Sequence, residues 1–335
     1  KVYLELCNNY ISEEVAKTIK GCILPKNTVV FAKIGEALKL NRRAITSCDC
    51  LIDNNVMGIA PKSDFLRIQY FYFFMKNLKI QTLAESTTVP SVRKTVLENY
   101  EIEVPSLDEQ KEIENKFAFA QKIIEKRKQE LSTLDNLIKA RFVEMFGDPT
   151  TNPKGYINLT VAEAIEAGYI EKPFDGNHGS KHPKASEYVE SGIPFLMANN
   201  IIDGNVDLTN CSFITEERAN KLDKGFAKNQ DVLITHKGTI GRTAVLRTDY
   251  EFVMLTPQVA AYRVKKGITP DYLCSYFTTE FFQNDMRLLA AAGGSTRAYA
   301  GITAQLQLRL IIPPLDEQKV YTDFIKQVDK SKFIQ

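Results

Sequence analysis

A long, uninterrupted heptad pattern between Leu107 and Phe146 constrains this chain more than any other feature. No Pro or Gly occurs before Gly147, so the spacing predicts one helix of about 38 residues, ~57 Å long. The apolar seam of a lone helix would be exposed to solvent, so the pattern predicts a partner helix. Apolar or long side chains recur in alternating steps of four and three at Ile113, Phe117, Ala120, Ile124, Arg127, Leu131, Leu134, Ile138, Arg141 and Met145.

A second copy of the helix start indicates an internal duplication. Residues 105–111 read PSLDEQK and residues 313–319 read PPLDEQK, identical at six of seven positions and 208 residues apart. The heptad spacing then restarts at Tyr321, Ile325, Val328 and Lys332. The second helix start supplies the partner that the first helix requires.

The regions upstream of the two helix starts also correspond. The apolar runs 29–32 and 232–235 align, as do residues 64–66 (DFL) and 271–273 (DYL). Nothing in the first copy matches residues 157–204, so we expect it to begin part-way through a domain. This organisation predicts a first mixed domain over 1–105, a long helix over 106–147, a second mixed domain over 148–313 and the start of a second helix over 314–335.

Both mixed regions contain short strand and helix patterns. Amphipathic spacing predicts helices over 64–78 and 271–292. Turn residues bound apolar runs that predict strands at 28–34, 55–60, 100–104, 195–197, 232–235, 243–247, 258–264 and 308–312. The predicted fold class is therefore α+β, with two mixed α/β domains.

Composition and motifs argue against catalysis by this chain. An amino-methyltransferase needs a Pro-Pro-aromatic loop for the target amine, whereas the Pro-Pro here precedes Leu315. There is no GxxxxGK[ST] loop for a nucleotide. The cysteines lack the spacing of a zinc site, and none of the histidines belongs to an HExxH motif. We expect no cofactor or metal in this chain, no membrane span, and a cytoplasmic location.

The helix entry, its duplication and the exit FGDPTTNPKG at residues 146–155 together resemble the DNA specificity subunit of type I restriction-modification systems. The likeness covers essentially the whole chain. It implies a non-catalytic subunit with two target-recognition domains, joined by long antiparallel coiled-coil helices in a pseudo-twofold internal repeat. Each domain would read one half of a bipartite site in double-stranded DNA.

The resemblance also implies partners. Methyltransferase (modification) subunits would use S-adenosylmethionine, and a restriction subunit would use ATP and magnesium. The helix would set the gap between the half-sites, since ~57 Å is about one and a half turns of DNA at ~34–36 Å per turn. From the residues alone, a coiled-coil interaction adaptor and the recognition part of a fused methyltransferase or nuclease stay open as alternatives.

Polar and cationic residues on predicted turns are the candidate DNA contacts. Asn amides can bond to adenine edges, and the Gly-rich run THKGTIGR at residues 235–242 suits phosphates. A plain turn or a solvated strand end is the alternative for each. The candidates are Lys33, Lys39, Asn41, Arg42, Arg43, Thr87, Thr88 and Arg93 in the first domain, and Asn199, Asn200, Thr235, His236, Lys237, Thr239, Arg242, Ser295, Thr296, Arg297 and Tyr299 in the second.

The heptad positions are candidates for the coiled-coil core. Leu137 and Phe142 lie off the strict seam, so they either face a partner's helix or add to the core. The predicted core residues are Ile113, Phe117, Ile124, Leu131, Leu134 and Ile138 in the first helix, and Tyr321, Ile325 and Val328 in the second.

Overall fold

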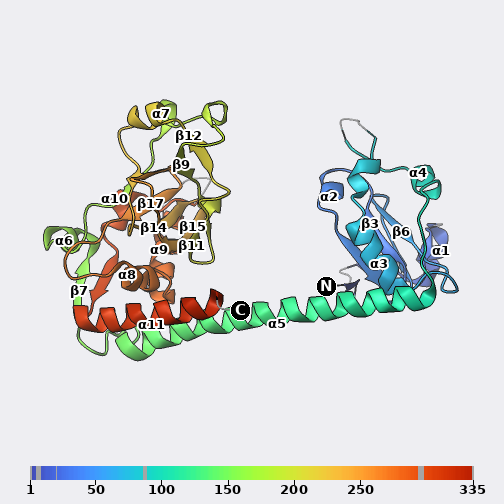
Figure 1. The fold of residues 1–335 in the computed structure, drawn as a ribbon, viewed down its shortest axis with the longest axis horizontal. Coiled ribbons are helices and arrows are strands. Elements are labelled where there is room, and N and C mark those ends of the chain that lie inside the picture. Colours follow the sequence, from blue (N-terminus) through green and yellow to red (C-terminus); the bar gives the residue numbers. More distant parts are fainter. Residues whose placement is uncertain (1, 5–8, 20, 86–88, 293–297, 334–335) are drawn as a thin grey trace. The chain divides into compact units, whose positions relative to one another are not determined.

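Two compact units divide the chain, unit 1 (Lys1–Lys128) and unit 2 (Gln129–Gln335). The computed structural model describes residues 2–4, 9–19, 21–85, 89–292 and 298–333 (Figure 1). The boundary between the units falls within helix α5 (Leu107–Phe146), so each unit contains one part of it. The helix predicted over these residues is confirmed.

Unit 1 is built on a four-stranded sheet in the order β1-β4-β3-β6. Helix α3 packs against β3 and β4, and its Phe71 and Met75 share a core with Val29 and Ile45. The predicted strands at 28–34 and 55–60 are confirmed as β3 and β6. The elements are β1 (Tyr3–Leu4), α1 (Glu13–Thr18), β2 (Ile23–Leu24), β3 (Val29–Ala32), α2 (Glu36–Lys39), β4 (Arg43–Thr46), β5 (Cys50–Leu51), β6 (Val56–Ile59), α3 (Ile68–Asn77), η1 (Ile80–Leu83) and α4 (Lys94–Glu98).

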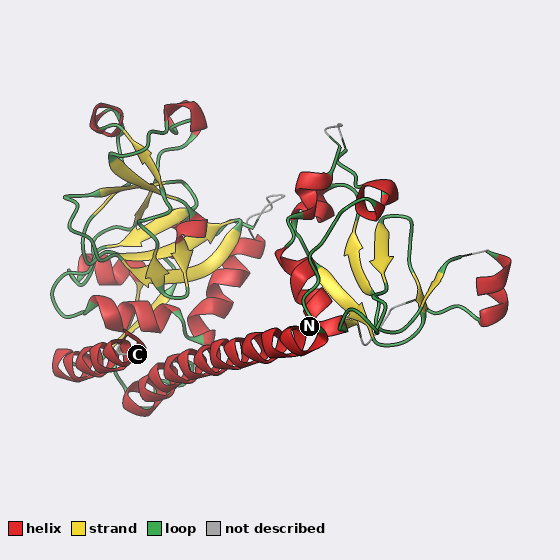
Figure 2. Ribbon diagram, turned by 45° about the vertical axis from the view of Figure 1, so that its right-hand side comes forward, coloured by secondary structure: helices red, strands yellow, loops and turns green. Residues whose placement is uncertain are grey.

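Unit 2 is layered around two four-stranded sheets, β15-β14-β17-β8 and β12-β9-β16-β13, with helices α8 and α9 packed against β14 and β15 (Figure 2). Its strands are β7 (Ile157–Thr160), β8 (Phe174–Asp175), β9 (Ile193–Leu196), β10 (Ile201–Ile202), β11 (Asn205–Val206), β12 (Ser212–Ile214), β13 (Phe226–Ala227), β14 (Val232–Lys237), β15 (Thr239–Val245), β16 (Val253–Leu255), β17 (Val259–Tyr262) and β18 (Arg309–Ile312). Its helices are α6 (Val161–Glu166), η2 (Gly179–Lys181), η3 (Ala185–Glu187), η4 (Ala198–Asn200), α7 (Glu216–Asn220), α8 (Pro270–Phe277), α9 (Glu280–Ala292), α10 (Ile302–Gln305) and α11 (Leu315–Phe333).

Alternate residues of β14 pack into two different hydrophobic cores. Val232 and Ile234 pack in the core that contains α8 and α9, whereas Leu233 packs with residues of the second sheet such as Leu196 and Leu255. This alternation follows from the two-residue period of a strand. The first sheet is therefore buried on both faces, and the unit has a helix, sheet, sheet order of layers.

Two predicted elements differ from the structure. The helix predicted over 271–292 is split into α8 and α9, because the Thr279 hydroxyl accepts a hydrogen bond from Phe282 N (3.4 Å) and caps the second helix. The strand predicted at 100–104 is wrong, since these residues form no strand. A strand needs a neighbour to satisfy its backbone, and none of the described residues of unit 1 pairs with this segment.

A buried glutamine fixes the start of α5 in unit 1. Gln110 is fully buried, and its Oε1 accepts a hydrogen bond from Arg67 N (2.8 Å), the residue that precedes α3. Its Nε2 donates to Phe65 O and Pro105 O, each at 2.8 Å. The helix predicted over 64–78 therefore begins later, at Ile68, because residues 63–65 form a turn and Phe65 O and Arg67 N bind this side chain.

The second copy repeats these hydrogen bonds in unit 2. Gln318 is also fully buried, and its Oε1 accepts from Thr269 N (2.9 Å), the N-cap of α8. Its Nε2 donates to Gly267 O (2.9 Å) and Pro313 O (2.8 Å). Thr269 therefore corresponds to Arg67, and the offset between the two copies at this point is 202 residues. With this offset, residues 64–66 correspond to 266–268. The predicted match with 271–273, which needs an offset of 207, is therefore wrong.

Helix α11 packs antiparallel on the C-terminal part of α5 within unit 2. The Tyr321 hydroxyl donates to Ile138 O (3.3 Å), whereas Lys332 Nζ, further along α11, lies 2.9 Å from Asp135 Oδ1, earlier in α5. Phe142 is buried against Tyr321, with ring centroids 5.7 Å apart. Phe142 therefore adds to the core. The predicted antiparallel helix packing is confirmed.

The described residues do not bury the predicted coiled-coil positions in the first half of α5. In unit 1, Phe117 is 48% exposed and stacks on Phe73 of α3 at 4.7 Å, and Ile113 is half-buried. Ile124 is 54% exposed. The described residues of α11 meet α5 only from about Asp135 onward, so nothing in them covers these earlier positions. Leu131, Leu134 and Ile138 are half-buried, and Tyr321, Ile325 and Val328 are buried.

We expect Gln318→Ala to destabilise unit 2 by about 2–4 kcal/mol, because it leaves buried backbone groups at Thr269 and Gly267 without partners. Urea unfolding would measure this change. Lys319→Ala is the matched control, since the Lys319 side chain is exposed beside the same helix turn. An unfolding free energy equal to that of the parent would contradict the role given to Gln318.

Candidate nucleic-acid interface

The β14–β15 hairpin carries five of the eleven predicted contacts of unit 2. The strands pair antiparallel up to Lys237 and Thr239, and an irregularity in register lies between Ile234 and His236. Gly238 forms the turn with φ of 77°, a conformation that costs glycine little. The hairpin end therefore presents Lys237 and Thr239 side by side.

Thr235 and His236 are fully buried, which corrects the prediction that they contact DNA. The Thr235 hydroxyl accepts a hydrogen bond from Arg242 N (2.9 Å) and so supports the irregular part of the hairpin. His236 Nδ1 lies 3.0 Å from Ala300 O and 3.1 Å from Gln305 Nε2. Burial lowers the pKa of His236, so the ring is neutral at pH 7. Both side chains hold the hairpin in place.

Tyr299 lies beside the hairpin end. A β-bridge pairs Tyr299 with Lys237, and Lys237 Nζ lies 5.4 Å from the centre of the Tyr299 ring. Gly238 N donates to Ala298 O (2.9 Å), which fixes the same segment. Burial raises the pKa of Tyr299, so its hydroxyl keeps its proton. The aromatic ring and the cation thus form one half-buried surface.

Two cations of this hairpin have no carboxylate partner in the described part of the chain. The Lys237 ammonium lies over the Tyr299 ring, and Arg242 is exposed, with a long contact from Nη1 to Ile201 O (3.5 Å). Some other cations of the unit are neutralised, as Arg263 is by Asp231 (2.7 Å). Positive charge is therefore left uncompensated at the hairpin.

The two asparagines after β9 have different environments. Asn200 is buried: its Oδ1 accepts from Met197 N (2.9 Å), and its Nδ2 donates to Asn210 O (3.4 Å). It stabilises the turn, which corrects the prediction that it bonds to adenine. Asn199 is exposed in the same turn, so its carboxamide faces solvent.

In unit 1, Arg43 and Asn41 stabilise the fold. Arg43 is buried and donates to Met75 O (3.1 Å) and to Asn41 Oδ1 (2.6 Å), and Asn41 Nδ2 donates to Lys76 O (3.0 Å). Burial lowers the pKa of Arg43 to about 10. These bonds satisfy carbonyls at the end of α3. The prediction that Arg43 contacts DNA is therefore corrected.

The other predicted contacts of unit 1 are more accessible. Lys39 pairs with Glu36 (2.7 Å) and Arg93 with Glu85 (2.8 Å), both at the surface. Arg42 is exposed and Lys33 is half-buried. The predicted contacts Thr87, Thr88, Ser295, Thr296 and Arg297 lie outside the described residues.

A polar cluster under the hairpin was not predicted. Asp175 is buried in β8, 2.8 Å from His178 Nε2 and 3.8 Å from His236 Nε2, and it accepts a hydrogen bond from Lys224. Burial opposes its ionisation, but the bonds from Lys224 and His178 outweigh burial, so the pKa of Asp175 is lowered. No sequence motif connects these distant positions. Among the described residues, no group of three His, Cys, Asp or Glu could hold a metal ion, and no helix is long and apolar enough to cross a membrane.

Both units share one plan, in which a sheet, a core helix and a buried glutamine precede a long helix. The sequence model of the family described as Type I restriction modification DNA specificity domain matches residues 4–133 and 174–334. The chain therefore belongs to this family, and the predicted resemblance and fold class are confirmed. Nothing in the comparisons favours the adaptor or fused-enzyme alternatives.

Proteins similar in sequence are described as specificity subunits of type I restriction enzymes. The chain is 23% identical to the type I restriction enzyme MjaVIII specificity subunit of Methanocaldococcus jannaschii, over 98% of this chain and 79% of that one. It is 24% identical to the EcoBI specificity subunit of Escherichia coli, over 66% and 49%. A solved structure described as the structural basis of complex assembly and conformational transition of the type I R-M system aligns with a TM-score of 0.51 and 18% identity, covering 92% of this chain and 76% of that one. That likeness supports the fold.

We expect Asp175→Asn to lower the free energy of unfolding at pH 7 by about 1–3 kcal/mol, because Lys224 and His178 lose the buried carboxylate that they bind. The folded-state pKa is lowered from 3.8, so the carboxylate stabilises the fold above about pH 4. Its contribution is lost as the pH falls through the lowered pKa. Unfolding free energies of parent and variant should therefore converge in acid. A difference that grows below pH 4 would contradict this account.

Proposed function

We propose that this chain is a non-catalytic specificity subunit that recognises DNA, each unit reading one half of a bipartite duplex site. Membership of the specificity family and the duplicated plan of the two units support the proposal. The observation that carries it is the uncompensated charge of Lys237 and Arg242 on the β14–β15 hairpin. Cations without a carboxylate partner can each neutralise a phosphate and release counterions.

The hairpin surface suits duplex DNA in its chemistry. Lys237 and Arg242 would bind phosphates, while the Thr239 and Tyr299 hydroxyls can donate to phosphate or base edges. Asn199 is the candidate for base recognition in unit 2, since its exposed carboxamide can pair with adenine N6 and N7. In unit 1, Arg42 and Lys33 are the corresponding candidates, with Lys39 and Arg93 available if their surface ion pairs open.

The partners we propose are methyltransferase (modification) subunits and a restriction subunit in a cytoplasmic complex. S-adenosylmethionine, ATP and magnesium would be bound by those subunits and not by this chain. Exposed apolar residues of α5 support a helix-binding role for it, since Phe119 is 67%, Ile123 is 53% and Leu137 is 46% exposed. Large apolar side chains gathered on one exposed helix are typical of a protein interface.

We expect the double variant Lys237→Ala/Arg242→Ala to bind duplex DNA more weakly. The slope of log Kd against the logarithm of the salt concentration should fall by about two units, because about one counterion-releasing contact is lost per residue. Fluorescence anisotropy at several salt concentrations would measure both changes.

The matched control is Lys221→Ala/Arg287→Ala. It removes the same charge from unit 2, but both side chains are paired with glutamates, at 2.6 Å each. The control should keep the parent's slope. If the hairpin variant binds with an unchanged slope, the hairpin is not part of the DNA interface.

We expect deletion of one heptad, residues 119–125, to alter the preferred gap between half-sites by about three base pairs. Seven residues span ~10.5 Å of helix, and a base pair about 3.4 Å. Sequencing of methylated sites in cells that also express the methyltransferase subunits would reveal the gap. The length-preserving control Lys122→Ala/Glu125→Ala, at two exposed positions of the same heptad, should keep it. Altered half-site sequences with an unchanged gap would refute the spacer role.

A further inference from the structure

An exposed carboxamide stands at the start of β17 in unit 2. Gln258 directly precedes this strand and is exposed, and its side chain forms no hydrogen bond within the described part of the chain. A glutamine side chain offers two donor hydrogens on its nitrogen and an acceptor oxygen. These groups are therefore available to a ligand. The sequence patterns did not select Gln258 as a candidate contact.

The backbone around Gln258 is fixed on both sides. His236 N donates to Gln258 O (3.0 Å), which extends the pairing of β14 with β17 by one residue. In the turn before the strand, Val259 N donates to Thr256 O (3.1 Å), and Thr256 N donates to Leu196 O (2.9 Å) of the second sheet. A side chain that distinguishes ligands needs such a rigid base, because loose placement weakens its hydrogen bonds.

The pairing also fixes the face of the sheet to which Gln258 belongs. Residues directly opposite each other on paired strands share a face, so Gln258 shares one with His236. Tyr299 covers His236, with ring centroids 5.5 Å apart, and Lys237 Nζ lies 5.4 Å from the centre of the Tyr299 ring. The carboxamide and the uncompensated ammonium therefore lie at the same end of one sheet.

The strand order places three kinds of group beside one another at this end. The sheet runs β15-β14-β17-β8, so Arg242 of β15, Lys237 of β14 and Gln258 before β17 stand on three successive strands. Two cations suit phosphates, which carry no sequence information, whereas a neutral carboxamide gains little from a phosphate and suits a base edge. The arrangement thus separates a positioning part of the surface from a reading part.

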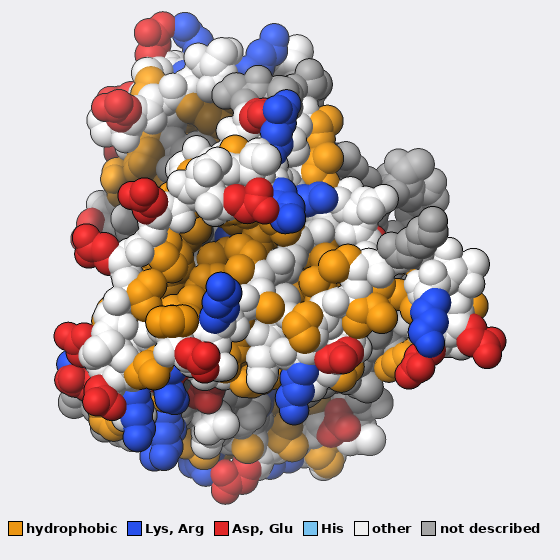
Figure 3. Space-filling model, turned by 90° about the vertical axis from the view of Figure 1, so that its right-hand side faces the viewer, with side chains coloured by type: hydrophobic (Ala, Val, Ile, Leu, Met, Phe, Trp, Pro, Cys, Tyr) orange, Lys and Arg blue, Asp and Glu red, His pale blue; other side chains and the backbone are white. Residues whose placement is uncertain are grey.

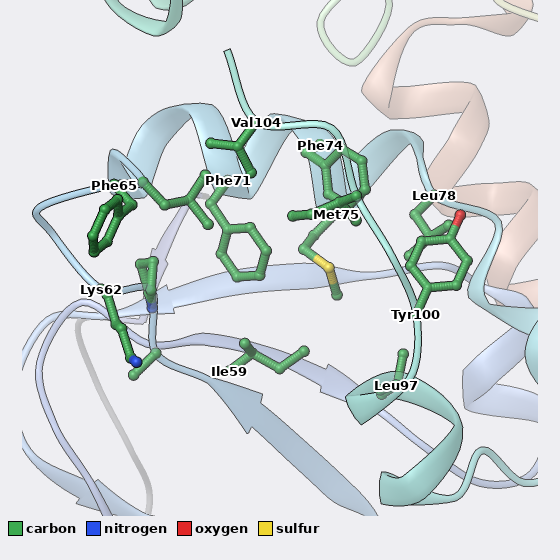
Figure 4. Close-up of a pocket in the computed structure, with 14 residues that line it drawn as sticks. Ile59, Lys62, Phe65, Phe71, Phe74, Met75, Leu78, Leu97, Tyr100 and Val104 are labelled. Carbon is green, nitrogen blue, oxygen red and sulfur yellow. The ribbon is translucent and has the colours of Figure 1, made fainter. Parts of the chain in front are cut away.

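The cavity of unit 1 has a different chemistry. An apolar space of about 330 Å³ lies there between α3, the end of β6 and the segment that leads into α5 (Figure 4). Phe71, Phe74 and Met75 line it from α3, and hydrophobic side chains also gather on the face of unit 1 seen in Figure 3. Adenine is distinguished by one donor and one acceptor, which call for polar groups. The carboxamide of unit 2 supplies both.

We propose that Gln258 is a specificity-determining residue that recognises adenine in the major groove of duplex DNA. Its Nε2 would donate to adenine N7, and its Oε1 would accept from adenine N6. Lys237 and Arg242 would hold the neighbouring phosphates. This inference rests on the DNA-recognition proposal and adds a second base-reading residue to Asn199.

The test is selection of bound duplexes from a random-sequence library by the full chain, followed by sequencing. We expect the parent to select adenine at one position where Gln258→Ala loses the preference by about tenfold or more. Gln258→Glu should prefer cytosine at that position, because a carboxylate accepts from cytosine N4. Gln258→Ala should keep the parent's salt dependence, since it removes no phosphate contact.

A modified base separates recognition from a structural role. Replacing the selected adenine with 7-deazaadenine removes the N7 acceptor and keeps the rest of the base. Binding by the parent should weaken about fivefold, because one hydrogen bond is lost. Binding by Gln258→Ala should not respond to the replacement. An equal response in the two proteins would overturn the inference.

Gln307→Ala is the matched control, because Gln307 is also exposed and lies in the turn between α10 and β18. It should keep every base preference of the parent. Unchanged preferences in Gln258→Ala, or a loss accompanied by a lower unfolding temperature, would overturn the inference. Duplex binding by the parent without base preference would overturn it and leave the role of the hairpin cations standing. Absence of duplex binding would overturn both.

Discussion

The hydrogen bonds of two buried glutamines position the rest of the structure. Gln110 and Gln318 each accept from the backbone N–H that precedes a core helix and donate to two carbonyls of neighbouring turns. A buried amide that lost any of these partners would be costly, so each long helix must leave its domain at one place. The first turn of each helix is also acidic, which suits the positive helix N-terminus. This explains why DEQK is the best-preserved part of the repeat.

The long helix and seven of the eight predicted strands agree with the structure, because their periods are local properties of the sequence. The failures share one physical cause, which is that partners distant in sequence decide burial. The segment 100–104 has strand-forming residues but no neighbour in unit 1, whereas its counterpart Arg309–Ile312 has β7. The heptad pattern continues through Phe117 and Ile124, but in the described part of the chain Phe117 stacks on Phe73 of α3 and Ile124 is 54% exposed.

The candidate interface was predicted in outline and not in detail. The hairpin at residues 235–242 could be found, because cations and hydroxyls around glycines are visible in the sequence. Neighbours such as Asn199 and Asn200 could not be separated, since one faces solvent and the other closes a turn. Arg42 and Arg43 differ for the same reason. The cluster around Asp175 joins three distant segments, so no spacing could reveal it.

The sheet that contains β14 is covered on both faces, and this has a consequence for how such a domain can diverge. Val232 to His236 are buried in β14, so mutation there disturbs one of two cores. Solvent-facing positions are confined to the hairpin end from Lys237 to Arg242. Exchange of this short end would therefore change the exposed surface of the hairpin and leave the scaffold beneath it unaltered.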